Sequence, residues 1–531
     1  MKNKFLYFGA SAILASMSLT SCNDLDTEPQ NNYVTATEKA DAIVNKPSLA
    51  SAGVVGISST YKQYEAVYAN HIDFGWPSVM LFMDSMGPDL YGYNIGYNWF
   101  ATAGQYDLGN NNNYMNNLAW YHAYKIIKSA NDVIGNIDPE TDNAQLQLFG
   151  AQGYANRAFM YFELAQLFQY TYKGHETLPC VPIVTELNSN DAASGIPRST
   201  VQEVYDQILS DLDKAIEWLD ACGLSTTKIA DVGAKRFVSL GTAYGIRARV
   251  NLVMNNWQAA ADDAAKAIQV SGATPLSIAE AGQPGFYDSE DHNWMWGIYI
   301  EPSDRVVTSG IINFPSHMGS FNDNGYWAVG AFRMISKSLY SSIPATDCRK
   351  GWWLDENGLS SNLNNNQQEF ITANAADPYT QVKFGPYQGV VGTTTNANDV
   401  PLMRVEEMYL IQAEATAMAG NAAGGKTMLE NFVQTYRNPE YSTTATTSTE
   451  VQEAVWNQRR IELWGEGFCY MDLLRLNKGL DRRGTGIEAV WVYNVPAPLK
   501  PFLVPNQEME TNSAITSNND SWIRPTAVDD I

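Results

Sequence analysis

Apolar residues recur every three or four positions through two long stretches of the chain, about 118–272 and about 401–480. That spacing places apolar side chains on one face of a helix, which can then pack against its neighbours. The predicted helices cover, in chain order, 120–137, 154–168, 201–219, 234–254, 257–268, 404–419, 426–436 and 451–477. The pattern therefore predicts a mainly α protein.

Local signals support the helix predicted over 201–219. Thr200 and Glu203 have the spacing of a capping box, and Gly223 follows the apolar stripe as a terminator. Short helices in succession, with lengths near the repeat unit of about 34 residues, resemble tetratricopeptide pairs. The expected scaffold is a tetratricopeptide-like stack of helical pairs.

The helical rhythm is absent from two intervals, about 71–117 and about 273–400, which are rich in Gly, Asn, Asp and aromatic residues. Irregular segments of this length inside a helical protein usually carry its function. We therefore expect long loops here, with a short helical stretch near 334–343, and we expect these loops to form a ligand face.

The aromatic residues of these intervals indicate what such a face would bind. Sugar rings stack their apolar C–H faces on aromatic rings, and their hydroxyls need amide, carboxylate and guanidinium partners. The candidate ligand-binding residues are Trp99, Trp296 and Trp327 first, then Trp76, Trp294 and Tyr326, with Asp73, Asn98 and Arg333 as polar partners. The alternative for each ring is a place in the local core.

The charge of the chain excludes one large class of function. The formal net charge is −23, and lysine and arginine form no clusters. The chain therefore lacks the basic surface that nucleic-acid phosphates require. Only 17% of the residues are charged, whereas tryptophan, tyrosine and glycine are plentiful. Such a composition favours neutral polar ligands, and we expect no nucleic acid among the partners.

The N-terminus predicts export and lipidation. Lys2 and Lys4 precede an apolar run, Phe5 to Leu19, that suits the h-region of a signal peptide. The run ends in Leu19-Thr20-Ser21-Cys22, which resembles a lipobox, where cleavage precedes a cysteine that becomes lipid-modified. An ordinary secretory signal is the alternative. The expected organisation is a lipoprotein signal peptide over 1–21, a lipidated Cys22 with a flexible tether over 22–40, and a single body over 41–531.

No cofactor is expected beyond the covalent lipid on Cys22. The other cysteines, Cys180, Cys222, Cys348 and Cys469, form no closely spaced pair, and the five histidines are scattered. That distribution does not predict a zinc site, while a metal that organises the loops is left open. We expect the four cysteines to be buried free thiols.

The acidic residues of the C-terminal helices invite an enzymatic interpretation, because glycoside hydrolysis needs two carboxylates on opposite sides of the scissile bond. Glu462 and Glu466 are four residues apart, so on one helix they would project from the same face. We therefore expect a helix-packing network of ion pairs. Its expected members are Arg459, Glu462, Glu466, Asp472 and Arg475, with the same interpretation for Arg404, Glu406 and Glu414.

Several ordered segments together resemble one known family, the SusD/RagB outer-membrane lipoproteins of Bacteroidota. The segments span nearly the whole chain after Cys22 and are unlike the family only at Phe468-Cys469, where a basic residue often stands. They are the lipobox at Cys22, 152–162, 201–205 with 211–216, 335–340 with 347–350, 401–415, 459–467 with 472–475, and 502–508. Residues 71–106 and 288–330 match no family motif.

The resemblance implies a scaffold of four tetratricopeptide-like pairs, a ligand site on irregular loops, and no enzymatic activity. It also implies an outer-membrane, lipid-anchored protein at the cell surface, which captures an oligosaccharide or polysaccharide and delivers it to a SusC-type TonB-dependent transporter. The first alternative is a peptide ligand, as in RagB-type uptake, and a remote alternative is an all-α glycan-cleaving enzyme.

Overall fold

The computed structural model describes residues 36–93, 99–106, 109–110 and 112–531. The chain divides into two units, Met1–Leu49 and Ala50–Ile531. In the described part of the first unit, helix α2 (Ala36–Asn45) begins inside the interval where the sequence predicts a flexible tether. The expected signal peptide and Cys22 lie outside the described residues.

The second unit is built on helices that mostly pack against their neighbours in the chain, while the last of them, α18, packs against α4 (Trp76–Met86) and α6. The first six of this scaffold are α3 (Ser51–Tyr61), α5 (Tyr114–Ile134), α6 (Ala144–Phe168), α7 (Val201–Cys222), α8 (Leu240–Val253) and α9 (Trp257–Ser271). The last four are α15 (Val405–Met418), α16 (Ala422–Tyr436), α17 (Ser448–Glu462) and α18 (Cys469–Arg475). Helix α15 packs against α9. The scaffold therefore resumes where it stopped, and residues 272–404 form an insertion in it.

The mainly helical class is confirmed, and α7 shows why its prediction was secure. The Thr200 side chain accepts a hydrogen bond from the Glu203 backbone N–H at 3.2 Å, and Glu203 accepts one from the Thr200 N–H at 2.7 Å. Gly223 ends the helix in the left-handed region, with φ of 59°. Both signals satisfy backbone groups that a helix end would otherwise leave unpaired.

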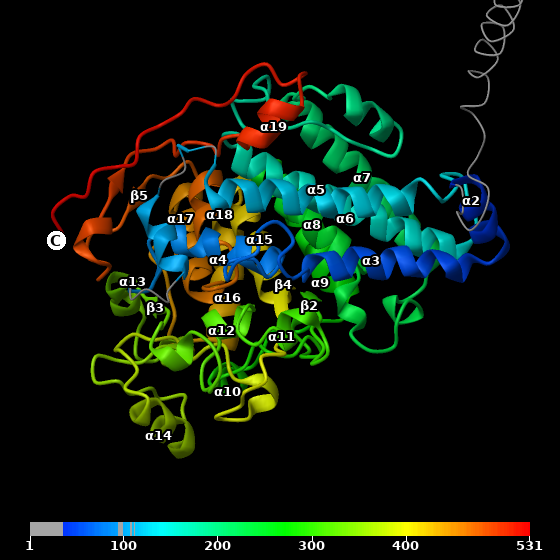
Figure 1. The fold of residues 1–531 in the computed structure, drawn as a ribbon. Coiled ribbons are helices and arrows are strands. Elements are labelled where there is room, and N and C mark those ends of the chain that lie inside the picture. Colours follow the sequence, from blue (N-terminus) through cyan, green and yellow to red (C-terminus); the bar gives the residue numbers. More distant parts are fainter. Residues whose placement is uncertain (1–35, 94–98, 107–108, 111) are drawn as a thin grey trace, which may run out of the picture. The chain divides into compact units, whose positions relative to one another are not determined.

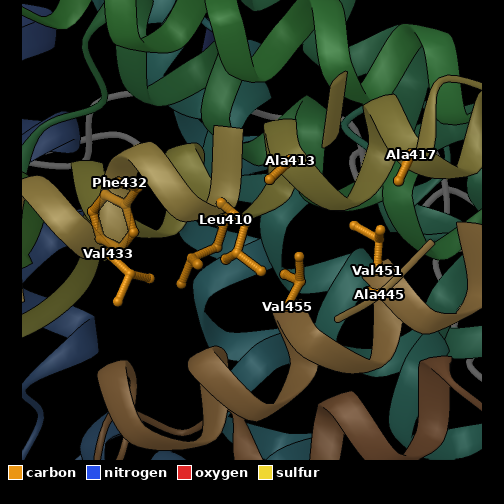
Figure 2. Packing of buried hydrophobic residues seen from close by; sticks show 9 residues of the cluster. Leu410, Ala413, Ala417, Phe432, Val433, Ala445, Val451 and Val455 are labelled. Carbon is orange, nitrogen blue, oxygen red and sulfur yellow. The ribbon is translucent and has the colours of Figure 1, made fainter. Parts of the chain in front are cut away.

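One buried cluster shows how the scaffold helices pack. Figure 2 shows side chains of α15, α16 and α17 directed into the space between these helices. Small residues of α15 allow close approach, and larger ones fill the space left. The cluster consists of Leu410, Ala413, Ala417, Leu429, Phe432, Val433, Ala445, Val451 and Val455.

Three helix predictions are wrong in their extent. The helix predicted over 154–168 begins earlier, at Ala144, where Asn143 caps it. The helix predicted over 234–254 begins at Leu240, because Ser239 caps it by accepting the Thr242 N–H at 3.1 Å. The helix predicted over 451–477 is broken between α17 and α18. Gly465 and Gly467 adopt φ of 80° and 89° there, a conformation that only glycine adopts at low cost.

The interval 71–117 contains a helix that the sequence analysis assigned to irregular loops. Helix α4 (Trp76–Met86) has every residue buried, so it shows no alternation of polar and apolar faces. Pro77 lies in its first turn, where a helix tolerates proline. A helix without a polar face gives no periodic signal, which is why the pattern missed it.

The insertion contains only short elements. In Figure 1, α10, α11, α12 and α14 gather at the bottom of the view, below the scaffold helices. Strand β2 pairs with β4 in antiparallel fashion and connects the insertion to the start of α15. These elements are α10 (Ile278–Ala281), β2 (Trp294–Ile298), α11 (Arg305–Thr308), α12 (Phe314–Met318), β3 (Met334–Ile335), α13 (Lys337–Ser342), α14 (Asn365–Ala373) and β4 (Val400–Arg404).

The C-terminal residues run along the scaffold. Strands β5 (Leu480–Asp481) and β6 (Asn494–Val495) pair with each other, and α19 (Asn506–Thr511) follows. The Phe502 N–H donates to the Leu167 carbonyl at 2.8 Å, which fastens this segment to α6. Among the described residues, none of the helices has both the length and the apolar character that a membrane crossing needs.

Candidate ligand-binding site

The two aromatic segments of the sequence meet at a short strand pair. Strand β1 (Leu90–Tyr91) pairs antiparallel with β3 (Met334–Ile335), so that Leu90 lies opposite Ile335. The first strand lies in the aromatic-rich interval 71–117 and the second in the aromatic-rich interval 273–400. The pair therefore brings together loops separated by more than 200 residues in the chain.

Trp99 marks the solvent-facing side of this meeting point. Its side chain is 39% exposed, and its ring centroid lies 5.2 Å from that of His71. His71 Nδ1 is hydrogen-bonded to the Tyr326 hydroxyl. Burial raises the pKa of Tyr326 to about 12, and a hydrogen bond with Trp99 acts in the opposite direction. The three side chains thus join both loops in one hydrogen-bonded group.

Three further rings pack against this group on its buried side. His317 stacks on Tyr326, with ring centroids 4.4 Å apart and an interplanar angle of 12°. The rings of Phe74 and Phe100 pack on His317 at 5.5 Å and 4.8 Å. Burial, followed by the positive charge of Arg333, lowers the pKa of His317 well below its usual value. We call these six residues, His71, Phe74, Trp99, Phe100, His317 and Tyr326, the aromatic cluster.

Arg333 lies beside the buried rings of the aromatic cluster. Its guanidinium carbon is 5.9 Å from the centroid of the Phe100 ring, and the residue is 1% exposed. Its Nε, Nη1 and Nη2 atoms have no hydrogen-bond partner within the described ranges. Burial alone lowers the pKa of Arg333 to about 9. The structure therefore brings three of the nine candidates together, Trp99, Tyr326 and Arg333. Trp99 is the exposed member of the three, whereas Tyr326 is 3% exposed and lies beneath the surface as Arg333 does.

The expected stacking roles of Trp296 and Trp294 need correction. Each is 1% exposed and lies in β2, packed against the scaffold. Trp296 contacts Phe159 of α6 edge to face at 4.9 Å, and its Nε1 donates to the Arg236 carbonyl at 3.2 Å. A ring enclosed on both faces cannot offer one to a sugar. The alternative interpretation, a place in the local core, holds for both residues.

The same correction applies to Trp76 and Trp327, which are also 1% exposed. Trp76 begins α4 and lines a cavity of about 60 Å³ inside the scaffold, together with Phe159 and Phe468. Trp327 stacks on Phe370 at 5.8 Å, in a separate apolar cluster of the insertion. Both rings fill space between elements of the fold.

The Asp73 carboxylate accepts hydrogen bonds from the backbone of its own loop. It is fully buried and accepts the backbone N–H groups of Val67 and Tyr68 at 2.6 and 2.7 Å. Burial raises its pKa, and these hydrogen bonds oppose that rise. Its oxygens therefore hold the loop that carries His71, which corrects the expected contact with ligand. Asn98, the remaining polar candidate, lies outside the described residues.

Sequence reasoning missed the two histidines of the aromatic cluster. His71 and His317 were counted only as scattered residues, although each lies within or beside one of the two aromatic segments. The one sequence signal is that each histidine stands three residues from a phenylalanine, His71 before Phe74 and His317 after Phe314. This spacing does not link the two histidines to each other, so only the fold shows that they meet at Tyr326.

The acidic residues of the C-terminal helices form the buried ion-pair network that their spacing predicts. Arg404 pairs with Glu406 and Glu462 at 3.1 Å each and with Glu466 at 2.8 Å. Arg459 and Arg475 share Asp472, and Arg475 also pairs with Glu414 at 2.6 Å. One detail differs from the expectation, because α17 ends at Glu462 and Glu466 lies in the following turn.

Residues of the insertion and Arg437, which directly follows α16, complete this network. The side chains around Glu462 and Glu466 are at most 3% exposed. Burial acts to raise the pKa of Glu462, but Arg437, Arg404 and Arg349 outweigh it and hold the pKa well below its usual value. The network around these two carboxylates consists of Arg349, Lys383, Arg404 and Arg437 with Asp347, Glu406, Glu462 and Glu466. Its carboxylates are engaged by cations, so the geometry supports a structural role.

Two further observations concern the chemistry of the body. Cys180, Cys222, Cys348 and Cys469 are free thiols, of which Cys180 is buried and the others half-buried. Within the parts of the chain that the structure describes, no group of three or more His, Cys, Asp or Glu side chains is arranged to hold a metal ion.

An open groove of about 590 Å³ lies between residues 338–347 and 438–461, with Tyr441 as its single aromatic lining residue.

Comparisons with known proteins agree with this fold. A family model described as starch-binding, associating with the outer membrane, matches residues 79–239, and a model of the SusD family matches residues 350–523. Together the two matches cover more than half of the chain. The SusD-like protein P2 of Formosa agariphila is 25% identical over 78% of this chain and 82% of its own length.

Solved structures share the fold at low sequence identity. A SusD-like carbohydrate-binding protein from Bacteroides vulgatus aligns with a TM-score of 0.69 at 21% identity, over 89% of this chain and 97% of that one. A SusD superfamily protein from Bacteroides thetaiotaomicron aligns with a TM-score of 0.69 at 20% identity, over 88% of this chain and 98% of that one. Family matches at both ends of the body and a shared fold along its length lead to one conclusion. The chain belongs to the SusD/RagB family.

Proposed function

We propose that this protein binds a glycan at the aromatic cluster and delivers it to a SusC-type TonB-dependent transporter of the outer membrane. The observation that carries the proposal is the exposed ring of Trp99, held by His71 and Tyr326 where two distant loops meet. An aromatic ring fixed at its edge and open to solvent is a platform on which a sugar ring can stack.

The family supports the choice of ligand. One matching model is described as starch-binding, and a structural neighbour is described as carbohydrate-binding. Stacking on one platform with a few hydrogen bonds gives affinities of about micromolar strength. That strength suits a protein that must also release its ligand to a transporter.

The proposal includes a lipid anchor on Cys22 and a position at the cell surface. The lipobox of the sequence and the outer-membrane association of the family support both. It includes no catalytic step, because Glu462 and Glu466 are paired with cations inside the fold. Incubation with oligosaccharides and analysis for shortened products would test that part directly.

The central experiment measures binding to a version of the protein that begins after Cys22. Oligosaccharides and peptides are titrated while heat and tryptophan fluorescence are recorded. Saturable binding of one glycan class is expected. Trp99→Ala should weaken that binding about tenfold or more, because it removes the stacking face.

Trp456→Ala is the matched control, because Trp456 is a half-buried surface tryptophan on α17 that stacks with Lys478 at 4.1 Å. It should leave the affinity unchanged. Equal loss in both variants would contradict a platform at Trp99. Binding of peptides alone, unaffected by Trp99→Ala, would replace the glycan with a peptide ligand.

Delivery needs a separate test in cells. Growth on the bound glycan should require both the chain and its transporter, and Trp99→Ala should slow growth only when the glycan is scarce. Normal uptake in cells that lack the chain would contradict the delivery role.

A further inference from the structure

Arg333 carries a buried positive charge that is paired with no carboxylate and no hydrogen-bond acceptor in the described chain. The structure contains five fully buried arginines among its largest buried side chains, namely Arg333, Arg349, Arg404, Arg437 and Arg482. The first is the exception among them, because all three of its guanidinium nitrogens lack an acceptor within the described residues. Proteins rarely retain an unpaired buried charge, since its desolvation is not compensated.

The other four buried arginines all have partners that offset the desolvation of their guanidinium groups. Arg349, Arg404 and Arg437 each bind the carboxylate of Glu462. Arg482 has no carboxylate, but its nitrogens donate to backbone carbonyls, including that of Met86 at 2.6 Å. Buried guanidinium groups in this protein are thus paired with a carboxylate or hydrogen-bonded to backbone carbonyls. Among the described residues, Arg333 has neither kind of partner.

The backbone of Arg333 is firmly placed, so its isolation does not come from a loose segment. Its carbonyl accepts the Gln381 N–H at 2.9 Å, and the next residue begins β3. Among the described residues, no acidic group raises the pKa of Arg333, whereas the charge of Arg333 lowers the pKa of His317 in the aromatic cluster. An unbalanced cation thus lies beside the rings that we assign to ligand binding.

We propose that Arg333 is the anion-recognising residue of the ligand site, and that the ligand is a glycan bearing an oxyanion, either a uronic acid carboxylate or a sulfate ester. The inference rests on the proposed function, since it names the class of glycan that the aromatic cluster takes. Arginine presents a planar fork of donors that matches both oxyanions. Because Arg333 is 1% exposed, the proposal requires its side chain to rotate away from the Phe100 ring when the ligand binds, so that the anion supplies the missing acceptors.

The test compares neutral, uronate-containing and sulfated oligosaccharides of matched length by calorimetry. The wild-type protein should prefer one acidic class. Arg333→Met should weaken that class by about 10- to 100-fold, the value of a hydrogen bond to a charged group, and leave neutral glycans unchanged. Arg333→Lys should retain part of the preference, because it keeps the charge but loses the fork.

Thermal unfolding without ligand separates this role from a structural one. Arg333→Met should melt at the same temperature as the wild type or higher, because it removes an unpaired buried charge. Arg305→Met is the control, an exposed arginine of the same insertion, and should change neither affinity nor melting.

Three results would overturn the inference. The first is equal binding of acidic glycans by Arg333→Met, and the second is a large drop in its melting temperature. The third is a wild-type preference for neutral glycans that still depends on Trp99, which would leave the proposed function intact. Absence of all glycan binding would overturn the proposed function and this inference together.

Discussion

Lys383 of the insertion donates a hydrogen bond from Nζ to Oε1 of Glu466 at 2.6 Å, and neither side chain is more than 3% exposed. The same ammonium group donates to the carbonyls of Glu462 and Trp464 at 3.0 and 2.8 Å. One cation thereby satisfies three acceptors in the turn after α17. The pair joins the insertion, which carries part of the proposed ligand site, to the scaffold in the interior of the protein.

Lys383→Met should lower the free energy of unfolding by about 3–5 kcal/mol, because it leaves a buried carboxylate and two buried carbonyls without this partner. Urea unfolding measures the change. Lys128→Met is the control, since Lys128 pairs with Asp132 on the surface with 75% of its side chain exposed. Its loss should be at most about 1 kcal/mol. Similar losses in the two variants would contradict the assigned role of Lys383.

The buried carboxyl of Asp84 should make stability fall as pH rises. It accepts the N–H groups of Gly467 and Cys469 at 2.7 and 3.0 Å. Burial outweighs these bonds and raises the pKa of Asp84 to about 7. The unfolded chain loses this proton near pH 3.9, so between about pH 4 and pH 7 the folded state holds more protons.

Asp84 should therefore contribute stability below about pH 4 that is lost as pH rises through about 7, by an amount on the order of 4 kcal/mol. Unfolding in urea across this range measures the profile. The variant Asp84→Asn has no group that titrates at this position. The unfolding free energy of the wild type should therefore fall relative to that of the variant as pH rises from about 4 to about 7. A constant difference at all pH values would show that Asp84 is ionised throughout.

The capping box of α7 predicts a small and specific loss. Thr200→Ala should cost about 1 kcal/mol, because it removes the acceptor of the Glu203 N–H at the helix start. Ser210→Ala removes an exposed hydroxyl from the interior of the same helix and should be neutral or slightly stabilising. Thermal or urea unfolding of both variants checks the contrast, and equal effects would contradict a capping role.

The corrected role of Trp296 leads to a prediction opposite to that for Trp99. Trp296→Ala should lower the free energy of unfolding by about 3–5 kcal/mol, because the buried ring packs between Tyr61 and Phe159. Glycan affinity per folded molecule should stay the same. Urea unfolding and calorimetry on one preparation measure both, and a loss of affinity without a loss of stability would return Trp296 to the ligand site.

The sequence predicted the scaffold better than the site, and the reason is physical. A helix such as α7 lies on the surface, so its apolar and polar residues alternate with the helical period and can be counted. Helix α4 is buried on every side and has no such alternation. Ends are predictable where side chains cap them, as at Thr200, and less so where glycine conformation decides, as at Gly465.

The site depends on contacts that no local pattern records. Trp99 and Trp327 stand in equally aromatic loops, yet one ring faces solvent and the other stacks on Phe370. The meeting of His71 with Tyr326 joins residues from two loops, and only the fold shows that Arg333 has no acceptor among the described residues. Composition could therefore name the loops that carry the site but not the side chains that form it.

The buried ion-pair network limits which scaffolds could accept this insertion from a related protein. Arg349 and Lys383 are contributed by the insertion, whereas Glu462 and Glu466 are contributed by the scaffold. An insertion grafted onto a scaffold without those two glutamates would bury Lys383 without a carboxylate and leave Arg349 with Asp347 as its counter-charge. Substitutions at exposed positions such as Val329 and Val390 therefore change the surface with little loss of stability. Substitutions at Arg349, Lys383, Glu462 or Glu466 destabilise the junction between insertion and scaffold.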